Sequence, residues 1–174
     1  MKKIIILILG LIIMSGCEKT INTPTSKVED LLNQYQNLSP SIIDNLKDSI
    51  EKEDMTKEQK KKYESLMEKQ YQSLSYKIKN EEIVEDTAVV DVEIEVLNYS
   101  YSIANSKKYY DEHREEIKDF NDYKLEQLEK VTDKIKYDLT LNLTRYNGFW
   151  ELDDIDNNDL EKIHGLSNFF ENVS

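Results

Sequence analysis

The stretch from Ala88 to Val96 constrains the fold most, because its apolar residues recur at every second position. The apolar members are Ala88, Val90, Val92, Ile94 and Val96, and the acidic residues between them are Asp91, Glu93 and Glu95. A strand places successive side chains on opposite faces of a sheet, so this alternation predicts one buried and one solvated face. Sheets with such faces are typically antiparallel.

Two further runs alternate in the same way, over residues 74–78 and 135–143. They place Tyr76 and Tyr137 on the inward face, and a turn is expected near Glu85-Asp86. The dipeptide Asn147-Gly148 leads from the second run into Phe149–Leu152 and favours a type I′ hairpin, which needs positive φ at both central residues. The sequence therefore predicts antiparallel strands that end in a hairpin.

Helical periodicity precedes the strands. Ser26-x-x-Glu29 has the form of a capping box for a first helix that runs to about Leu38. A second helix is predicted over 42–50 and a third from Thr56-x-x-Gln59, with an apolar stripe of Tyr63, Leu66, Met67 and Tyr71.

Helical patterns also interrupt and follow the strands. Residues from about 101 to 134 are polar with a weaker helical stripe, which predicts a helical insertion between strands. Asn158-x-x-Glu161 caps a short last helix that Gly165 ends. The predicted class is α+β, with N-terminal helices packed on a curved antiparallel sheet.

The first sixteen residues have the layout of a secretory signal. Lys2 and Lys3 give a positive start, residues 4–14 are apolar except for Gly10, and Ser15-Gly16 are small. As a helix the apolar part spans about 16 Å, roughly half of a 30 Å hydrocarbon core, so a permanent transmembrane helix is not expected.

The segment Met14-Ser15-Gly16-Cys17 resembles the lipobox of bacterial lipoproteins, with Met in the place of the usual Leu. The resemblance implies a diacylglyceryl group on the Cys17 thiol and cleavage before Cys17. It therefore implies a protein anchored by lipid to the outer face of the cell membrane. Residues 1–16 are then the signal peptide, 17–25 the lipidated N-terminus and tether, and 26–174 a single domain.

The net charge limits the partners that the protein can bind, and the cysteine content limits its disulfides. The formal net charge is −12, and removal of Lys2 and Lys3 with the signal makes the mature part more negative. Such a surface repels nucleic acid and anionic headgroups, so no nucleic-acid partner is expected. Because Cys17 is the only cysteine, the domain has no intramolecular disulfide.

Three segments carry a resemblance to a fold family: Tyr76–Asn80, Asp86–Ile94 and Asn147–Asp153. They look like segments in uncharacterised lipoproteins of low-GC Gram-positive bacteria with the cystatin-like cone of the nuclear transport factor 2-like superfamily. The resemblance covers about residues 27–165 and departs from the usual pattern at Glu85-Asp86 and in the helical insertion. It implies a curved sheet that wraps a long helix and leaves a cone-shaped pocket, used by some members for ligands and by a few for catalysis.

Candidate sites outside the lipobox do not match known chemistry. Read as a calcium loop from Asp154, the acidic segment 153–159 has Asp159 where a sharp turn needs Gly and Gly165 where a bidentate Glu is needed, so a helix-capping turn is expected instead. His113 and His164 lack metal-ligand spacing and are expected on the surface. The sequence predicts no catalytic residue, metal or cofactor.

The leading interpretation is a non-catalytic envelope lipoprotein that binds a small-molecule ligand or an envelope protein. One alternative is an isomerase- or dehydratase-like enzyme, which needs a water-excluded carboxylate beside a tyrosine in the cone. Another is a precursor whose cleaved signal peptide acts as a pheromone.

Overall fold

The computed structural model describes residues 22–167, so Met14, Ser15, Gly16 and Cys17 of the lipobox lie outside the described residues. The elements, in chain order, are α1 (Pro24–Gln36), α2 (Pro40–Glu51), α3 (Lys57–Ser73), β1 (Ser75–Val84), β2 (Thr87–Leu97), α4 (Tyr99–Glu112), α5 (Phe120–Glu129), β3 (Lys134–Tyr146), β4 (Phe149–Leu152) and α6 (Asn157–Ile163). The strands form one antiparallel sheet in the order β1-β2-β3-β4.

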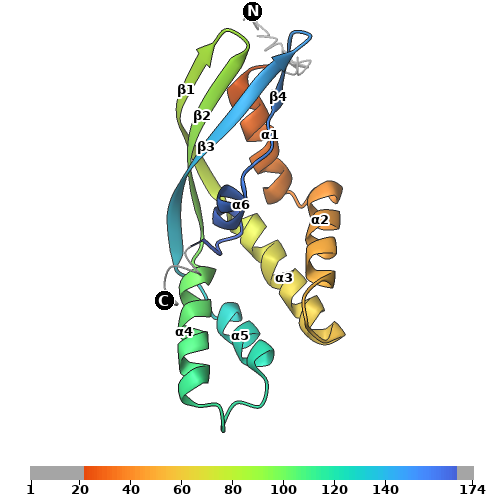
Figure 1. Cartoon of the computed structure of the whole chain (residues 1–174), viewed down its shortest axis with the longest axis vertical. Helices are drawn as coiled ribbons and strands as arrows, with labels where there is room; N and C mark the ends of the chain where they lie inside the picture. Colours follow the sequence, from red (N-terminus) through yellow and green to blue (C-terminus); the bar gives the residue numbers. More distant parts are fainter. Residues whose placement is uncertain (1–21, 168–174) are drawn as a thin grey trace, which may run out of the picture.

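The predicted fold class is confirmed. Figure 1 shows a long, twisted sheet with α1, α3 and α6 against one face, and α4 and α5 at the end of the sheet away from the hairpin turns. The pair α4–α5 is the predicted helical insertion between β2 and β3. In the part of the chain that the structure describes, no helix is long and apolar enough to span a bilayer.

The inner face of the sheet is closed by packing. Val90, Val92, Ile94 and Val96 are fully buried and lie beside inward residues of β3, with Ile94 opposite Tyr137. Tyr137 points inward as predicted, and Tyr76 is partly buried against the same core. The cone-shaped pocket that the family resemblance implied is therefore filled by side chains under the sheet.

The outer face of the sheet carries the predicted acids. Glu93 accepts hydrogen bonds from Lys136 at 2.9 Å and pairs with Lys79 at 2.8 Å, and these contacts lower the pKa of its carboxyl to about 2. Both turns between strands follow the sequence as well. Asn147 and Gly148 have φ of 51° and 84°, as a type I′ turn requires, and Glu85 has φ of 54° in the β1–β2 turn.

Two helix starts differ from the prediction. Thr23, rather than Ser26, caps α1: Thr23 Oγ1 accepts from the Ser26 backbone at 3.1 Å, and Pro24 is well suited to the first helical position. Asp156, rather than Asn158, caps α6 and accepts from the Asp159 backbone at 2.8 Å. The sequence offered several capping residues in a row at both places. The Thr56–Gln59 capping box of α3 is confirmed.

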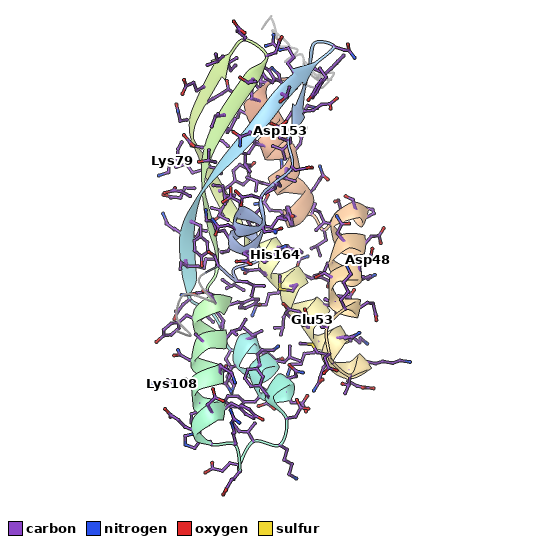
Figure 2. All side chains as sticks on the ribbon, viewed as in Figure 1. Asp48, Glu53, Lys79, Lys108, Asp153 and His164 are labelled. Carbon is purple, nitrogen blue, oxygen red and sulfur yellow. The ribbon has the colours of Figure 1, made fainter. Side chains whose placement is uncertain are left out.

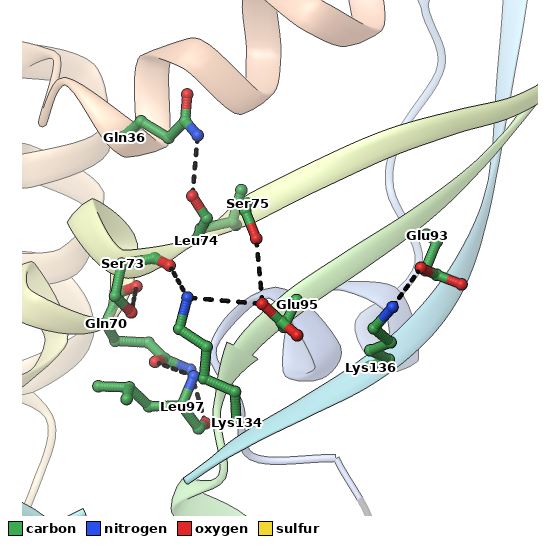
Figure 3. A network of polar contacts seen from close by, with 10 residues as sticks. All are labelled: Gln36, Gln70, Ser73, Leu74, Ser75, Glu93, Glu95, Leu97, Lys134 and Lys136. Atoms are coloured by element: carbon green, nitrogen blue, oxygen red, sulfur yellow. Dashed lines mark hydrogen bonds and ion pairs between the residues drawn. The ribbon is translucent and has the colours of Figure 1, made fainter. Parts of the chain in front are cut away.

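Polar contacts join the end of α3 to the sheet (Figure 3). Gln36 of α1 donates to the Leu74 carbonyl at 2.8 Å, and Lys134 donates to the Ser73 carbonyl at 2.9 Å. Deeper in the core, Gln70 is fully buried and bonds both backbone groups of Leu97, accepting from its N–H at 2.8 Å and donating to its carbonyl at 3.1 Å. These bonds fix the position of α3 relative to β2.

Candidate functional site

A cavity of about 280 Å³ lies among α1, α2, α3 and the end of α6. Its polar lining consists of Tyr35, Asn45, Ser49, Glu53, Tyr63, Tyr71 and His164, and its apolar lining consists of Ile42, Leu46, Ile50, Met67, Leu160 and Leu166. We call it the tyrosine cavity. Its volume is at the lower end of the range found for small-molecule sites, and the mixture of apolar walls with a few polar groups is typical of them.

One face of α3 forms the long wall of the tyrosine cavity. Tyr63, Met67 and Tyr71 follow one another at four-residue spacing and therefore lie on the same side of the helix. Tyr35 of α1 packs edge-on against Tyr71, with ring centroids 5.0 Å apart and planes at 72°. Tyr35 is 6% exposed and Tyr71 is 2% exposed, so both rings are part of the core.

The hydroxyls of Tyr35, Tyr63 and Tyr71 make no hydrogen bond to any residue within 22–167. Buried tyrosine hydroxyls usually have a partner, so the rings of Tyr35 and Tyr71 are buried while their hydroxyls are not fully enclosed. Every fully enclosed side-chain polar atom in the same part of the chain is paired. The hydroxyl of the buried Tyr71 therefore reaches accessible space, and the space that its ring lines is the cavity.

Electrostatics keep these hydroxyls protonated. Burial, followed by the nearby Glu53 carboxylate, raises the pKa of Tyr63 to about 12. Burial also raises the pKa of Tyr35 and of Tyr71, and the adjacent Tyr35 and Tyr63 raise that of Tyr71 further. The cavity therefore presents three phenol donors at neutral pH, close enough to influence one another.

His164 belongs to the lining of the cavity, and its expected surface position is wrong. It follows α6, and its ring centroid is 5.7 Å from that of Tyr71. Burial lowers its pKa to about 4, so the imidazole is neutral at physiological pH. No residue of the described chain bonds its ring nitrogens. Figure 2 shows His164 beside α3 and Glu53 near the end of α2.

The two other candidates have local structural roles. The acidic segment after β4 is the capping turn of α6, as expected, and the buried Asp159 pairs with Lys162 at 2.7 Å. His113 stacks on Tyr109 at the exposed end of α4, with ring centroids 3.9 Å apart. Across residues 22–167, no three His, Cys, Asp or Glu side chains are grouped to hold a metal ion.

A second hollow of about 380 Å³ lies between α4 and α5. It is lined by Tyr101, Tyr109 and Tyr123 and by polar groups that include the charged Lys130 and Asp133. Tyr101 is 67% exposed, and Tyr109 is already stacked between His113 and Tyr123. This groove is more open to solvent than the tyrosine cavity, so its polar groups are more readily hydrated.

Comparison with protein-family models, with curated proteins and with solved structures found no match. The candidate site therefore rests on the geometry of this chain alone. Sequence reasoning assigned Tyr63 and Tyr71 to an apolar stripe and did not single out Tyr35 or Glu53. The available signal was the use of tyrosine, instead of leucine or isoleucine, at inward positions of α1 and α3.

Proposed function

We propose that the protein is a lipid-anchored envelope lipoprotein whose domain binds a small molecule in the tyrosine cavity. The observation that carries the binding role is that the hydroxyls of Tyr35, Tyr63 and Tyr71, which line the tyrosine cavity, bond no residue within 22–167. A phenol hydroxyl that no residue of the described chain engages can donate a hydrogen bond to a ligand or accept one from it.

The lining indicates the chemistry of the ligand. Glu53 is the one acidic side chain among the described lining residues, and the His164 imidazole is neutral. A carboxylate at the rim disfavours anions and favours an amine, which the aromatic faces of the tyrosines also attract. The proposed ligand is a small amine with an apolar body, whose ammonium group donates to Glu53 or to the phenol oxygens of the cavity.

Binding, rather than catalysis, is proposed because the carboxylates are poorly placed for acid–base chemistry. The buried Asp159 is neutralised by Lys162, and Glu53 is exposed to solvent. The inner face of the sheet, where an isomerase-like site would lie, is filled by Val92, Ile94 and their neighbours.

Anchoring is proposed from the lipobox of the sequence and has its own test. Cys17→Ala is expected to abolish incorporation of labelled fatty acid and to block normal processing of the precursor. Lipid labelling that persisted in this variant would refute the assignment of Cys17.

The binding role is tested by titrating the purified protein with three probes of similar size: 2-phenylethylamine, 2-phenylethanol and phenylacetate. We expect the amine to bind most tightly and the anion least, as measured by calorimetry. Ser49→Trp, on the exposed rim, should block the cavity, whereas Asp48→Trp, exposed but outside the lining, should not. Equal binding to both variants, or tighter binding of phenylacetate, contradicts the proposal.

A further inference from the structure

Exposed apolar side chains gather at one end of the sheet. Of the six large hydrophobic residues that are exposed within 22–167, four lie at the ends of two hairpins. They are Ile83 and Val84 in β1, at 47% and 58% exposure, and Tyr146 and Phe149 in β3 and β4, at 55% and 63%. We call these four residues the hairpin tip. Elsewhere the solvated face of the sheet carries charged and polar residues such as Glu93 and Lys136.

The two hairpin ends are neighbours in space. The Arg145 backbone donates to the Asp86 carbonyl at 2.7 Å, which joins the β1–β2 turn to β3. Tyr146 and Phe149 are direct partners across the Asn147-Gly148 turn. Figure 1 shows both turns at the end of the sheet where α1 begins, with α4 and α5 at the opposite end. The four residues therefore share one end of the sheet, although Ile83 and Val84 point to opposite faces of it.

The described chain starts at this surface. Asn22, its first residue, donates to the Gly148 carbonyl at 3.0 Å and accepts from the Trp150 backbone at 3.0 Å. Asn22 follows Cys17 by only five positions in the sequence. A backbone of that length reaches at most about 18 Å. A lipid on Cys17 would therefore hold the hairpin tip close to the bilayer surface.

We infer that the hairpin tip docks on the outer surface of the bilayer that holds the Cys17 lipid. This inference rests on the lipid anchoring proposed above. Tyr146 is suited to the level of the headgroups, where its apolar ring can be buried while its hydroxyl stays hydrated, and Phe149 adds apolar surface beside it. The sheet then stands away from the membrane, and the α4–α5 pair points outward into the envelope.

The charges beside the hairpin tip determine which interactions can hold it on the bilayer. Glu82, Glu85 and Asp86 are exposed, and Arg145 is 3.8 Å from Asp86. Acidic groups do not attract anionic headgroups, so the contact depends on apolar burial. On phosphatidylcholine vesicles it should therefore be insensitive to salt, and at low salt it should be weaker on phosphatidylglycerol vesicles.

The test uses the lipidated protein in phosphatidylcholine vesicles. Because the lipid occupies Cys17, an introduced cysteine is the only free thiol and accepts an environment-sensitive fluorophore. Tyr146→Cys places the fluorophore at the hairpin tip, and Tyr101→Cys, of similar exposure on α4, is the matched control. We expect a blue shift and a severalfold rise in emission at position 146 on vesicles, and no change at position 101.

A second measurement does not depend on a label at the hairpin tip. A donor dye on Lys108→Cys, exposed in α4, reports energy transfer to acceptor lipids in the bilayer. Tyr146→Ser with Phe149→Ser should increase transfer, because an undocked domain tilts toward the membrane.

If the protein floats with vesicles but neither readout changes, docking is wrong and anchoring stands. If it does not float, the anchoring fails and docking with it. If the signals change with protein concentration in the absence of vesicles, the hairpin tip binds a second copy of the chain. That result overturns the inference.

Discussion

The two sides of α3 differ in how their polar groups are paired. On the side that meets the sheet, Gln70 bonds both backbone groups of Leu97, and the Tyr99 hydroxyl donates to the Leu66 carbonyl at 3.0 Å. On the side that meets α2, the hydroxyls of Tyr63 and Tyr71 have no partner within the described chain. On the side of α3 that meets the sheet these polar groups have protein partners, whereas on the side that meets α2 the two hydroxyls have none within the described chain.

The difference separates structural polar groups from those available to a ligand. A buried group with its bonds satisfied stabilises the fold and fixes the register of α3 against β2. An accessible hydroxyl that bonds no residue of the described chain contributes little to the fold and is available to a ligand. Substitutions on the first side should therefore change stability, and substitutions on the second should change binding.

The largest effect is expected at Gly165, which closes the sheet side of α3. It has φ of 69°, and a Cβ there would overlap the Gln70 amide and lie 2.5 Å from the Leu97 carbonyl. Gly165→Ala should lower the free energy of unfolding by about 4 kcal/mol, from overpacking and backbone strain together. Chemical denaturation measures this change.

Gly148→Ala is the control for backbone strain alone. Gly148 also has positive φ, but a Cβ added there would meet no atom within 4 Å, so its substitution should cost about 1 kcal/mol. Equal losses of unfolding free energy at both glycines would show that the overlap with Gln70 and Leu97 does not destabilise the protein.

A smaller effect is expected from Gln70→Leu, which keeps the apolar volume but removes both bonds to Leu97. The buried backbone groups of Leu97 lose their partner, so stability should fall by about 3 kcal/mol. Gln36→Leu removes one partly buried bond, to the Leu74 carbonyl, and should cost about 1 kcal/mol. If Gln70→Leu is as stable as the parent, the sheet side of α3 is not held as described.

The sequence specified the elements of the fold well and their polar interior poorly. The alternation around Val92, the Asn147-Gly148 turn and the Thr56 capping box depend on neighbouring residues, so local patterns were sufficient. The start of α1 was misplaced because Thr23 and Ser26 are both good caps, and only Pro24 distinguishes them.

The candidate site could not be predicted for a physical reason. Tyr35, Tyr71 and His164 come from three helical segments that are far apart in the sequence and meet only through tertiary packing. A helical stripe identifies tyrosines as inward-facing, but it does not show whether their hydroxyls find partners. His164 looked like a surface residue because it follows a short polar helix.

A moderate effect is expected from pH through His164, on the cavity side. Burial lowers its folded pKa to about 4, below the usual value of 6.5, so the unfolded chain binds the proton more readily. This contribution to stability is complete above pH 6.5 and is lost as the pH falls toward 4, by about 2 kcal/mol after allowance for partial exposure. In His164→Gln, unfolding titrations between pH 7 and 4 should lack this component. An identical pH dependence in both proteins would show that the His164 side chain is exposed to solvent in the folded protein.

The most direct test is Tyr71→Phe, which removes one unpaired hydroxyl and leaves the ring in place. The account predicts that stability changes by less than about 0.5 kcal/mol, while affinity for 2-phenylethylamine falls about fivefold, as measured on the same sample. A clear loss of stability with unchanged affinity would show that the hydroxyl serves the fold, and would contradict the assignment of the tyrosine cavity as a binding site.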